Sequence, residues 1–288
     1  MLNKGRMPTH RPFRRATLVI LLLSSLLHAE PGSDKADSAE ALFISGKRHY
    51  LGEGVPKDPA KALVLIREAA EEGLPEAQGW YGFLLASGSG TSRDETAGLL
   101  WIRKAAAAGV PSAQFNLGQM LMKGSGAERD PAAAADWITR AAEGGQVEAQ
   151  AKLAEHFYFG TDAVEKDVAE ALPWAKRAAE AGHAWSQNLY GNLLEWGETV
   201  PVDRALAMQW YRKAAEQGHA KAQSSLGRLY ASGLVGKRDV VEAYYWLWES
   251  SGHGEASALI FLKDMVHGMT EEERKEALKR IGVEAEGK

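Results

Sequence analysis

The sequence predicts an all-α protein in which antiparallel helix pairs stack into a solenoid. The first observation is an internal repeat, because the pair Ala-Gln returns at intervals of 36 or 37 residues, with one Ser-Gln variant. The second is that small residues recur at helical spacing inside each copy, and the third is that glycine and aspartate punctuate every copy. A period of this length is typical of repeat proteins, whose units bury their apolar faces only against neighbouring units.

The first helix of each copy begins at this pair. With its small first residue taken as slot 0, slots 0, 4, 5 and 8 share one helix face, and in one copy they hold Ala113, Leu117, Gly118 and Leu121. Slot 5 is small in every copy, which predicts the close approach of another helix. Slot 11 is always glycine, which predicts a left-handed helix end. The slot 11 glycines are Gly52, Gly88, Gly124, Gly160, Gly197 and Gly233.

The second helix of each copy begins at an aspartate, a strong N-cap whose charge suits the positive helix end. These aspartates are Asp58, Asp94, Asp130, Asp167, Asp203 and Asp239. Tryptophan, or Leu65 in the first copy, follows inside the helix, and a pair of small residues comes one turn later. Pro173 lies deep inside its helix, which predicts a kink or a loosened fourth repeat.

The stretch ASGSGTSRD, residues 86–94, has the glycines and hydroxyl residues of a phosphate-binding loop. Its counterparts in the other copies share only the first glycine and the last aspartate. We therefore interpret it as the turn between two antiparallel helices.

The whole pattern resembles the Sel1-like repeat family, a branch of the tetratricopeptide-type α-solenoids. The resemblance rests on AQFNLGQMLMKGSG, then Asp130, Trp137 and AAEGG, and it covers residues 39–255 in six copies. It implies a right-handed α/α superhelix. Thr270 and Glu273 have capping-box spacing, so we expect residues 256–288 to form capping helices and a tail.

Residues 1–29 have the three parts of a secretory signal peptide: a basic block, an apolar run over residues 16–27, and the small residue Ala29. The run is shorter than the roughly 20 residues that span a bilayer. We expect cleavage after Ala29, a flexible linker over residues 30–38, and a bacterial periplasmic location. An uncleaved anchor and an organellar transit peptide are the alternatives.

Composition and motifs argue against several classes of function. A net charge of -4 offers no basic excess for nucleic acid, and the absence of cysteine excludes thiol catalysis, CxxC metal sites and disulfides. The motifs GxSxG, HExxH, Walker A and GxGxxG are absent too. His183 and His219 share one slot after the closing glycine, where we expect turn or packing residues. We therefore expect no enzymatic activity, no cofactor and no metal.

The first helices carry apolar side chains outside their packing face. Slots 2, 3, 6, 9 and 10 would be polar if they only faced water, yet several hold aromatic residues or methionine. First helices line the concave surface of such solenoids, so these side chains predict a partner-binding groove. The alternative is additional core between repeats, which we favour for Tyr158. The candidate groove residues are Trp80, Phe83, Phe115, Met122, Phe159 and Trp196.

These observations predict a monomeric, non-enzymatic adaptor or scaffold that binds a protein or peptide and has no membrane span in its mature form. One rival is an envelope component that binds glycan or peptidoglycan, with aromatic side chains stacked on sugars. The other is a β-lactamase-like hydrolase, as credited to cysteine-rich members of the family that the chain resembles. This chain lacks their cysteines and any nucleophile motif.

Overall fold

The computed structural model describes residues 33–283, and every regular element in that range is an α-helix. The predicted signal peptide, residues 1–29, lies outside the described residues. None of the described helices combines the length and the apolarity that a membrane span requires. The helices are α1 (Ser33–Leu51), α2 (Pro59–Glu71), α3 (Pro75–Ser87), α4 (Glu95–Ala107), α5 (Pro111–Lys123), α6 (Pro131–Glu143), α7 (Val147–Phe159), α8 (Val168–Glu180), α9 (Ala184–Trp196), α10 (Arg204–Glu216), α11 (Ala220–Ser232), α12 (Val240–Gly252), α13 (Ala256–His267) and α14 (Glu271–Arg280).

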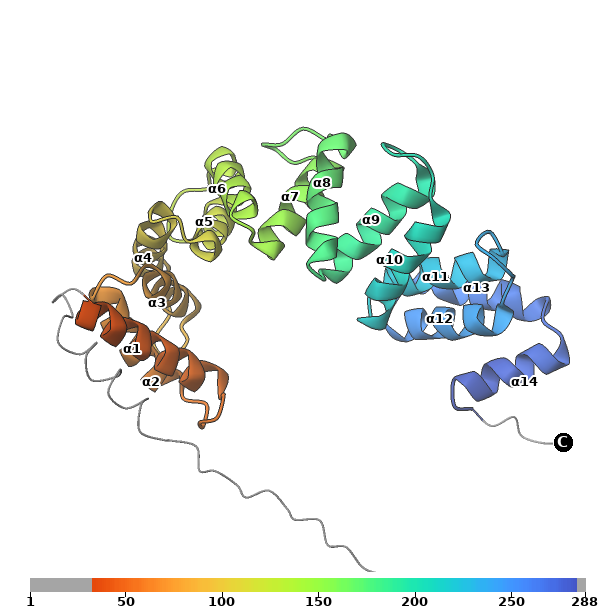
Figure 1. Ribbon diagram of the computed structural model, residues 1–288, viewed down its shortest axis with the longest axis horizontal. Helices are drawn as coiled ribbons and strands as arrows, with labels where there is room; N and C mark the ends of the chain where they lie inside the picture. Colours follow the sequence, from red (N-terminus) through yellow and green to blue (C-terminus); the bar gives the residue numbers. More distant parts are fainter. Residues whose placement is uncertain (1–32, 284–288) are drawn as a thin grey trace, which may run out of the picture.

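Consecutive helices pack against one another, and the resulting pairs stack into a curved array (Figure 1). Odd-numbered helices also contact the next odd-numbered helix, as α3 does with α5 and α7 with α9. In Figure 1, α3 and α5 lie on the inner side of the arc, and α4 and α6 lie on the outer side. The odd-numbered helices therefore line the concave surface, and the predicted all-α solenoid of helix pairs is confirmed.

The repeat aspartates are N-caps, as predicted. Each carboxylate accepts a hydrogen bond of 2.9–3.1 Å from a backbone N–H two or three residues further on. The backbone N–H of Asp94 also donates to the carbonyl of Leu85 in the preceding helix, and that of Asp130 donates to Leu121, both at 2.9 Å. Each aspartate therefore begins one helix and ties the loop to the helix before it.

The glutamine that follows alanine in the repeat joins neighbouring pairs, a role that the sequence analysis does not predict. Gln114 Nε2 donates to the carbonyl of Ala106 (3.3 Å), and Gln150 Nε2 donates to that of Ala142 (3.1 Å). The same bond recurs at Gln78, Gln187 and Gln223. The acceptors lie in the last turn of the preceding second helix, where carbonyls lack their regular helical partner. A mostly buried side chain thus satisfies a helix end at each junction.

Complementary side-chain sizes set the distance between the two helices of a pair. Gly118 on α5 faces Ile138 on α6, and a Cβ at Gly118 would lie 2.7 Å from Ile138 Cγ1. Gly46 and Gly82 face Ile66 and Ile102 in the same way. The fourth pair replaces both members, because Ala154 on α7 shares a buried cluster with Ala175 on α8. The small slot 5 predicted from the sequence is therefore a contact site for the second helix.

Two local features differ from the expectations. Helix α8 continues through Pro173 without interruption. The proline is on the exposed side of the helix, where the carbonyl that it leaves unpaired can turn toward water. Helix α1 begins at Ser33, inside the range 30–38 for which we expect a linker.

The last two helices close the array differently from a regular pair. Helix α14 packs against α12, and its N-terminus has the predicted capping box between Thr270 and Glu273. Helix α13 packs against α11 and α12 and leaves Leu259, Ile260 and Phe261 exposed. The charged helix α14 therefore caps the even-numbered side of the stack.

Candidate binding groove

Five cavities follow one another along the surface of the odd-numbered helices. Their lining comes mainly from α3, α5, α7, α9 and α11, with contributions from α1 and α13 at the two ends. Four of the cavities share side chains, such as Phe83 and Asn116 near the N-terminal end and Gln119 in the middle, whereas the cavity between α9 and α11 shares none with them. We call this row of cavities the groove.

Three aromatic rings form the N-terminal end of the groove. Tyr50 from α1 and Trp80 and Phe83 from α3 line a cavity of about 280 Å³, which we call the aromatic pocket. The ring centroids lie 5.6–6.4 Å apart, and each ring plane is inclined by 74–83° to the other two. Gly79, Ser112 and Asn116 complete the lining. A Cβ at Gly79 would lie 3.3 Å from the Cβ of Ala113 and 3.4 Å from that of Ala105, so this glycine lets the next helices pack closely beside the pocket.

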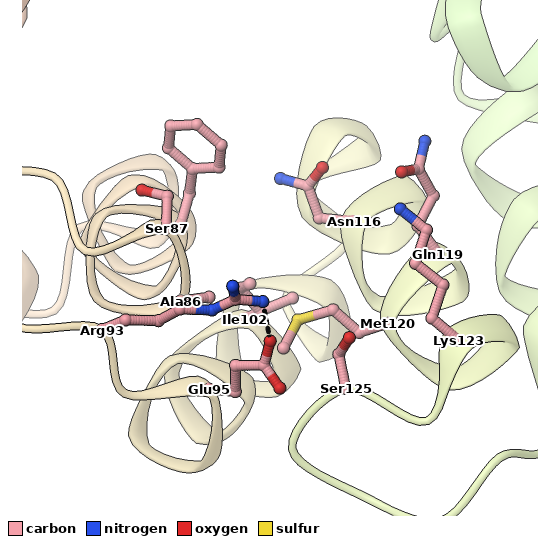
Figure 2. A pocket seen from close by; sticks show the side chains of 11 residues that line it. Ala86, Ser87, Arg93, Glu95, Ile102, Asn116, Gln119, Met120, Lys123 and Ser125 are labelled. Carbon is pink, nitrogen blue, oxygen red and sulfur yellow. Dashed lines mark hydrogen bonds and ion pairs between the residues drawn. The ribbon is translucent and has the colours of Figure 1, made fainter.

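A second cavity, of about 190 Å³, adjoins the aromatic pocket and shares Phe83 and Asn116 with it. Its apolar lining comes from Ala86, Ile102 and Met120. Figure 2 shows Arg93 and Glu95 paired on one side of the cavity, with Gln119 and Lys123 on α5 opposite them. The cavity therefore combines an apolar floor with a polar rim.

The predicted groove residues do not share one environment. Trp80 and Phe83 line the aromatic pocket, and Phe83 is 38% exposed. Met122 lines a central cavity and packs partly against the core of its pair. Phe115 is only 9% exposed and packs with Ile138, although it also lines a cavity beside α7. Slot 2 is largely a packing position. An inner helix contacts its partner and both neighbouring pairs, so a larger part of its circumference is buried than in a helix that contacts its partner alone.

Phe159 and Trp196 lie at the C-terminal ends of α7 and α9 and line none of these five cavities. They are 64% and 60% exposed. The Phe159 ring packs edge-on against Tyr158, with centroids 4.9 Å apart, and the Arg228 guanidinium lies 5.5 Å from the Trp196 ring centre. The structure thus joins Trp80 with Phe83 but does not bring Phe159 and Trp196 to them.

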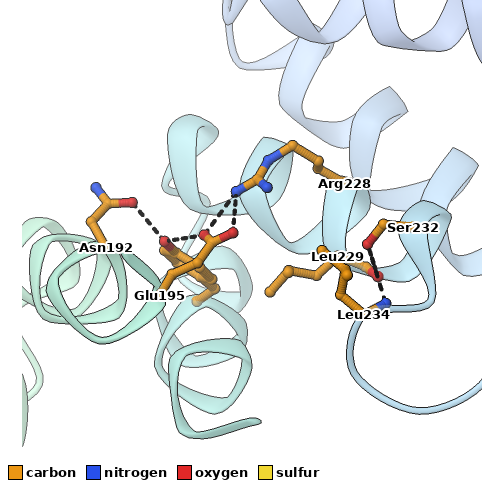
Figure 3. A network of polar contacts seen from close by, with 7 residues as sticks. Asn192, Glu195, Arg228, Leu229, Ser232 and Leu234 are labelled. Atoms are coloured by element: carbon orange, nitrogen blue, oxygen red, sulfur yellow. Dashed lines mark hydrogen bonds and ion pairs between the residues drawn. The ribbon is translucent and has the colours of Figure 1, made fainter. Parts of the chain in front are cut away.

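A buried polar network joins α9, α10 and α11 (Figure 3). Glu195 is 1% exposed, and one Arg228 nitrogen donates to both of its carboxylate oxygens at 2.7 and 2.8 Å. The Tyr211 hydroxyl lies 2.9 Å from Glu195 Oε2 and 2.6 Å from Asn192 Oδ1. Burial, and then the Glu195 charge, raise the pKa of Tyr211 far above its usual value, so the phenol stays neutral.

The single phenolic proton of Tyr211 decides how the network is connected. A phenol donates one hydrogen bond, and the charged Glu195 is the stronger acceptor. Asn192 Oδ1 also faces the Tyr211 hydroxyl, at 2.6 Å, and is the weaker of the two acceptors. The network therefore holds Asn192 in place at the wall of the groove cavity that it lines.

Sequence reasoning missed Tyr50, Glu195 and Tyr211. Tyr50 occupies slot 9 of the first copy, as Tyr158 does in the fourth. It is thus an aromatic residue outside the packing face, which is the criterion that selects the other groove candidates. Glu195 is a lone carboxylate in a slot that holds apolar residues elsewhere. Tyr211 occupies the position of the isoleucine that faces a slot 5 glycine in other copies. The deviations of Glu195 and Tyr211 from the repeat pattern were the sequence signal for the polar network.

The histidines after the closing glycines are helix caps. Nδ1 of His183 accepts from the N–H of Ser186, and Nδ1 of His219 accepts from that of Ala222, each at 3.3 Å. Burial lowers the pKa of both imidazoles, which suits a neutral ring that accepts a hydrogen bond. Between residues 33 and 283, no group of three or more histidine or acidic side chains is placed to hold a metal ion.

His253 and Ser257 do not form a nucleophile pair. Nδ1 of His253 lies 3.0 Å from Gln223 Oε1, whereas the Ser257 hydroxyl donates to Glu255 at 2.6 Å. Each side chain is therefore engaged in a structural contact at the junction of α12 and α13.

The helix pairs, their repeat length and their shared concave surface define a helical-repeat protein of the solenoid class. The Sel1 repeat family matches residues 39–74, 75–110, 111–146, 147–183, 186–219 and 220–247. The chain belongs to this family, and the resemblance inferred from the sequence is confirmed.

Solved structures of Sel1 repeat proteins are similar to this chain. A Sel1 repeat protein from Oxalobacter formigenes is 35% identical with a TM-score of 0.68, over 79% of this chain and 66% of its own. The protective antigen c5321 of uropathogenic Escherichia coli, which has an SLR fold, is 29% identical with a TM-score of 0.51. The similarity covers 85% of this chain and 60% of the antigen. The chain thus spans less than two thirds of either relative. A comparison with curated proteins found no match.

Proposed function

We propose that this chain is a non-enzymatic adaptor that binds an extended segment of a partner protein along its groove. Sel1 repeat solenoids generally serve as protein-interaction scaffolds. The observation that carries the proposal is the row of cavities, which follows the concave face and begins at the aromatic pocket. Concave sites with mostly apolar walls and a few polar groups are typical of ligand binding.

The polar lining of the groove supports a peptide as the ligand. Asn116 and Gln119 line the cavities near the N-terminal end, and Asn188 and Asn192 line the cavity between α9 and α11. A carboxamide side chain has both a donor and an acceptor, the same pair that a peptide group offers. Such side chains can hold the main chain of an extended segment while the apolar cavities receive its side chains.

The cellular part of the proposal depends on the N-terminal sequence. The basic block, the apolar run and Ala29 support export and an envelope role, most simply in a bacterial periplasm. The test is to fractionate cells that produce the full chain with a C-terminal tag. Recovery in the cytoplasmic fraction, with residues 1–29 still attached, would contradict export.

Photocrosslinking tests the binding site directly. A benzophenone amino acid in place of Ser112, which is exposed in the aromatic pocket, should crosslink a partner segment in cells that express the chain. The matched control puts the same group in place of Arg103, which is exposed on the outer helix α4. Crosslinking from Arg103 that equals crosslinking from Ser112, or none from either, would refute groove binding.

The absence of enzymatic activity is also a proposal that one assay checks. The chain has no cysteine, and His253 and Ser257 are held apart by other contacts. We expect no turnover of a chromogenic cephalosporin by the purified chain. Turnover that disappears in His253→Ala would favour the hydrolase instead.

A further inference from the structure

Cations already occupy ring faces beside the aromatic pocket, and this limits what can bind there. Lys47 Nζ lies 5.4 Å from the Trp80 ring centre, and Lys57 Nζ lies 6.0 Å from the Tyr50 ring centre. Aromatic faces attract cations, so two of the three rings are partly satisfied by this chain's own lysines. A cationic ligand would be repelled by these lysines, so the pocket favours a neutral group whose C–H bonds meet the rings.

We propose that the aromatic pocket binds a proline of an extended, acidic partner peptide. This inference rests on the adaptor function and names the class of peptide. Proline is a compact neutral ring, and proline-rich segments in the polyproline II conformation dock into aromatic-lined grooves. The pocket volume of about 280 Å³ lies near the lower limit for ligand pockets, which suits one side chain.

The polar groups around the pocket match the main chain of such a segment. A polyproline II helix has no internal hydrogen bonds, so its carbonyls need donors from the partner. Trp80, Ser112 and Asn116 line the pocket and carry an indole N–H, a hydroxyl and an amide NH₂. The pocket therefore provides both aromatic surface for stacking and donors for hydrogen bonds.

The adjoining cavity offers a second subsite for the same segment. Phe83 and Asn116 line both cavities, so the Phe83 ring stands between two places where a side chain can enter. The floor of the second cavity is apolar. Residues three apart in a polyproline II helix lie on one side at a spacing of about 9 Å, so two subsites around one ring can receive two side chains of one segment.

The charges at this end of the groove favour acidic neighbours of the proline. Arg93 is paired with Glu95, whereas Lys47, Lys57 and Lys123 take part in none of the ion pairs among the described residues. Unpaired positive charge thus surrounds the two subsites in a chain whose net charge is -4. Complementary charge on a partner increases its association rate and its selectivity.

Fluorescence anisotropy with labelled peptides and the full chain tests the proposal. The probe is a dozen-residue repeat of Pro-Pro-Glu, and two control peptides replace every proline by alanine or every glutamate by lysine. An oligosaccharide of N-acetylglucosamine is added as a competitor in a separate series. We expect saturable binding of the probe, at least tenfold weaker binding of both control peptides, and no competition by the sugar.

Three variants connect the binding to the pocket. Phe83→Ala removes the ring between the subsites, and Ser112→Trp fills the pocket from its exposed rim without changing a core residue. Each should weaken binding of the probe by about tenfold or more. Phe159→Ala is the matched control, because it removes an exposed ring outside both cavities. Circular dichroism checks folding, and Ser112→Trp decides the matter if Phe83→Ala unfolds.

The outcomes separate this inference from the adaptor function. Equal binding of the alanine peptide, tighter binding of the lysine peptide, or competition by the sugar would overturn the proline assignment. Failure of the probe to bind would do the same, while crosslinking from position 112 would keep the adaptor function. Loss of crosslinking itself would contradict the adaptor function.

Discussion

Replacing Ala175 with isoleucine should destabilise the fourth helix pair, and Ala154→Gly on the facing helix should restore it. Both alanines are fully buried in one cluster. In the three pairs that carry isoleucine at the equivalent position, the facing residue is glycine, and an added Cβ there would lie 2.5–2.7 Å from an isoleucine Cγ1. An isoleucine at position 175 would meet the Ala154 methyl at a similar separation, well inside the contact distance of about 3.5–4.0 Å.

The expected energies follow from the atoms that change. Overpacking by Ala175→Ile costs about 1–3 kcal/mol. Ala154→Gly alone loses about 0.8 kcal/mol for a buried methyl and about 1 kcal/mol of helix propensity. In the double variant the overlap is gone, and three additional buried carbons contribute about 2.4 kcal/mol. The double variant should therefore be about as stable as the parent, whereas additive losses would total about 3–5 kcal/mol.

Urea unfolding followed by circular dichroism measures these differences. Because repeat arrays can unfold in more than one step, hydrogen exchange of the α7 and α8 amides provides a local measure as well. Ala154→Gly combined with Ile66→Val in the first pair is the control, and its losses should add within about 0.5 kcal/mol. Losses that also add in the double variant of Ala154 and Ala175 would refute the size pairing.

Three further predictions concern stability. Arg228→Ala leaves the Glu195 carboxylate buried without its ion partner, so urea unfolding should show a loss of about 3–5 kcal/mol, and a loss below about 1 kcal/mol would contradict the network. Burial lowers the pKa of His183 and His219 below 6.5, so the unfolded chain binds protons first and the melting temperature should fall as the pH drops below that value. Replacing both histidines with asparagine, which caps without titrating, should reduce this fall, and an unchanged pH dependence would exclude them as its source. Pro173→Ala restores a helical hydrogen bond on an exposed face and should raise stability by up to about 3 kcal/mol, seen as a higher urea midpoint.

The fold could be predicted because its main signals act over short distances along the chain. A cap such as Asp94 needs only its own side chain and the N–H of Ala97, three residues away. The helix-ending glycine Gly88 needs only its positive φ of 74°. When such local signals recur with one period, the arrangement of pairs follows from the repeat itself.

The groove could be predicted only in part, because its contents depend on contacts between helices from different copies. Phe83 and Trp80 are one turn apart, but Tyr50 joins them from another helix pair. The sequence shows Gly90 only as one residue of the turn over residues 86–94, yet a Cβ there would collide with the carbonyl of Pro59 in the previous copy. Phe115 is aromatic, as a groove residue would be, but it is buried like a core residue. Only the packing of neighbouring pairs shows which of these two roles it has.

The division between packing slots and groove slots indicates where specificity is encoded. Slots 0 and 5 stay small in every copy and slot 1 is glutamine at every junction, because helix contacts and a carbonyl hydrogen bond require them. Slots 3 and 6 recur in the groove lining, and their chemistry changes from copy to copy. They hold Trp80 and Phe83, then Asn116 and Gln119, then Lys152 and Glu155. From α3 to α7 these residues run from aromatic to amide to charged, and they line the groove, although Trp80 also packs against the cluster of Ile66. An extended segment bound along the groove would therefore be recognised in one direction, with its apolar residues toward α3 and its charged residues toward α7.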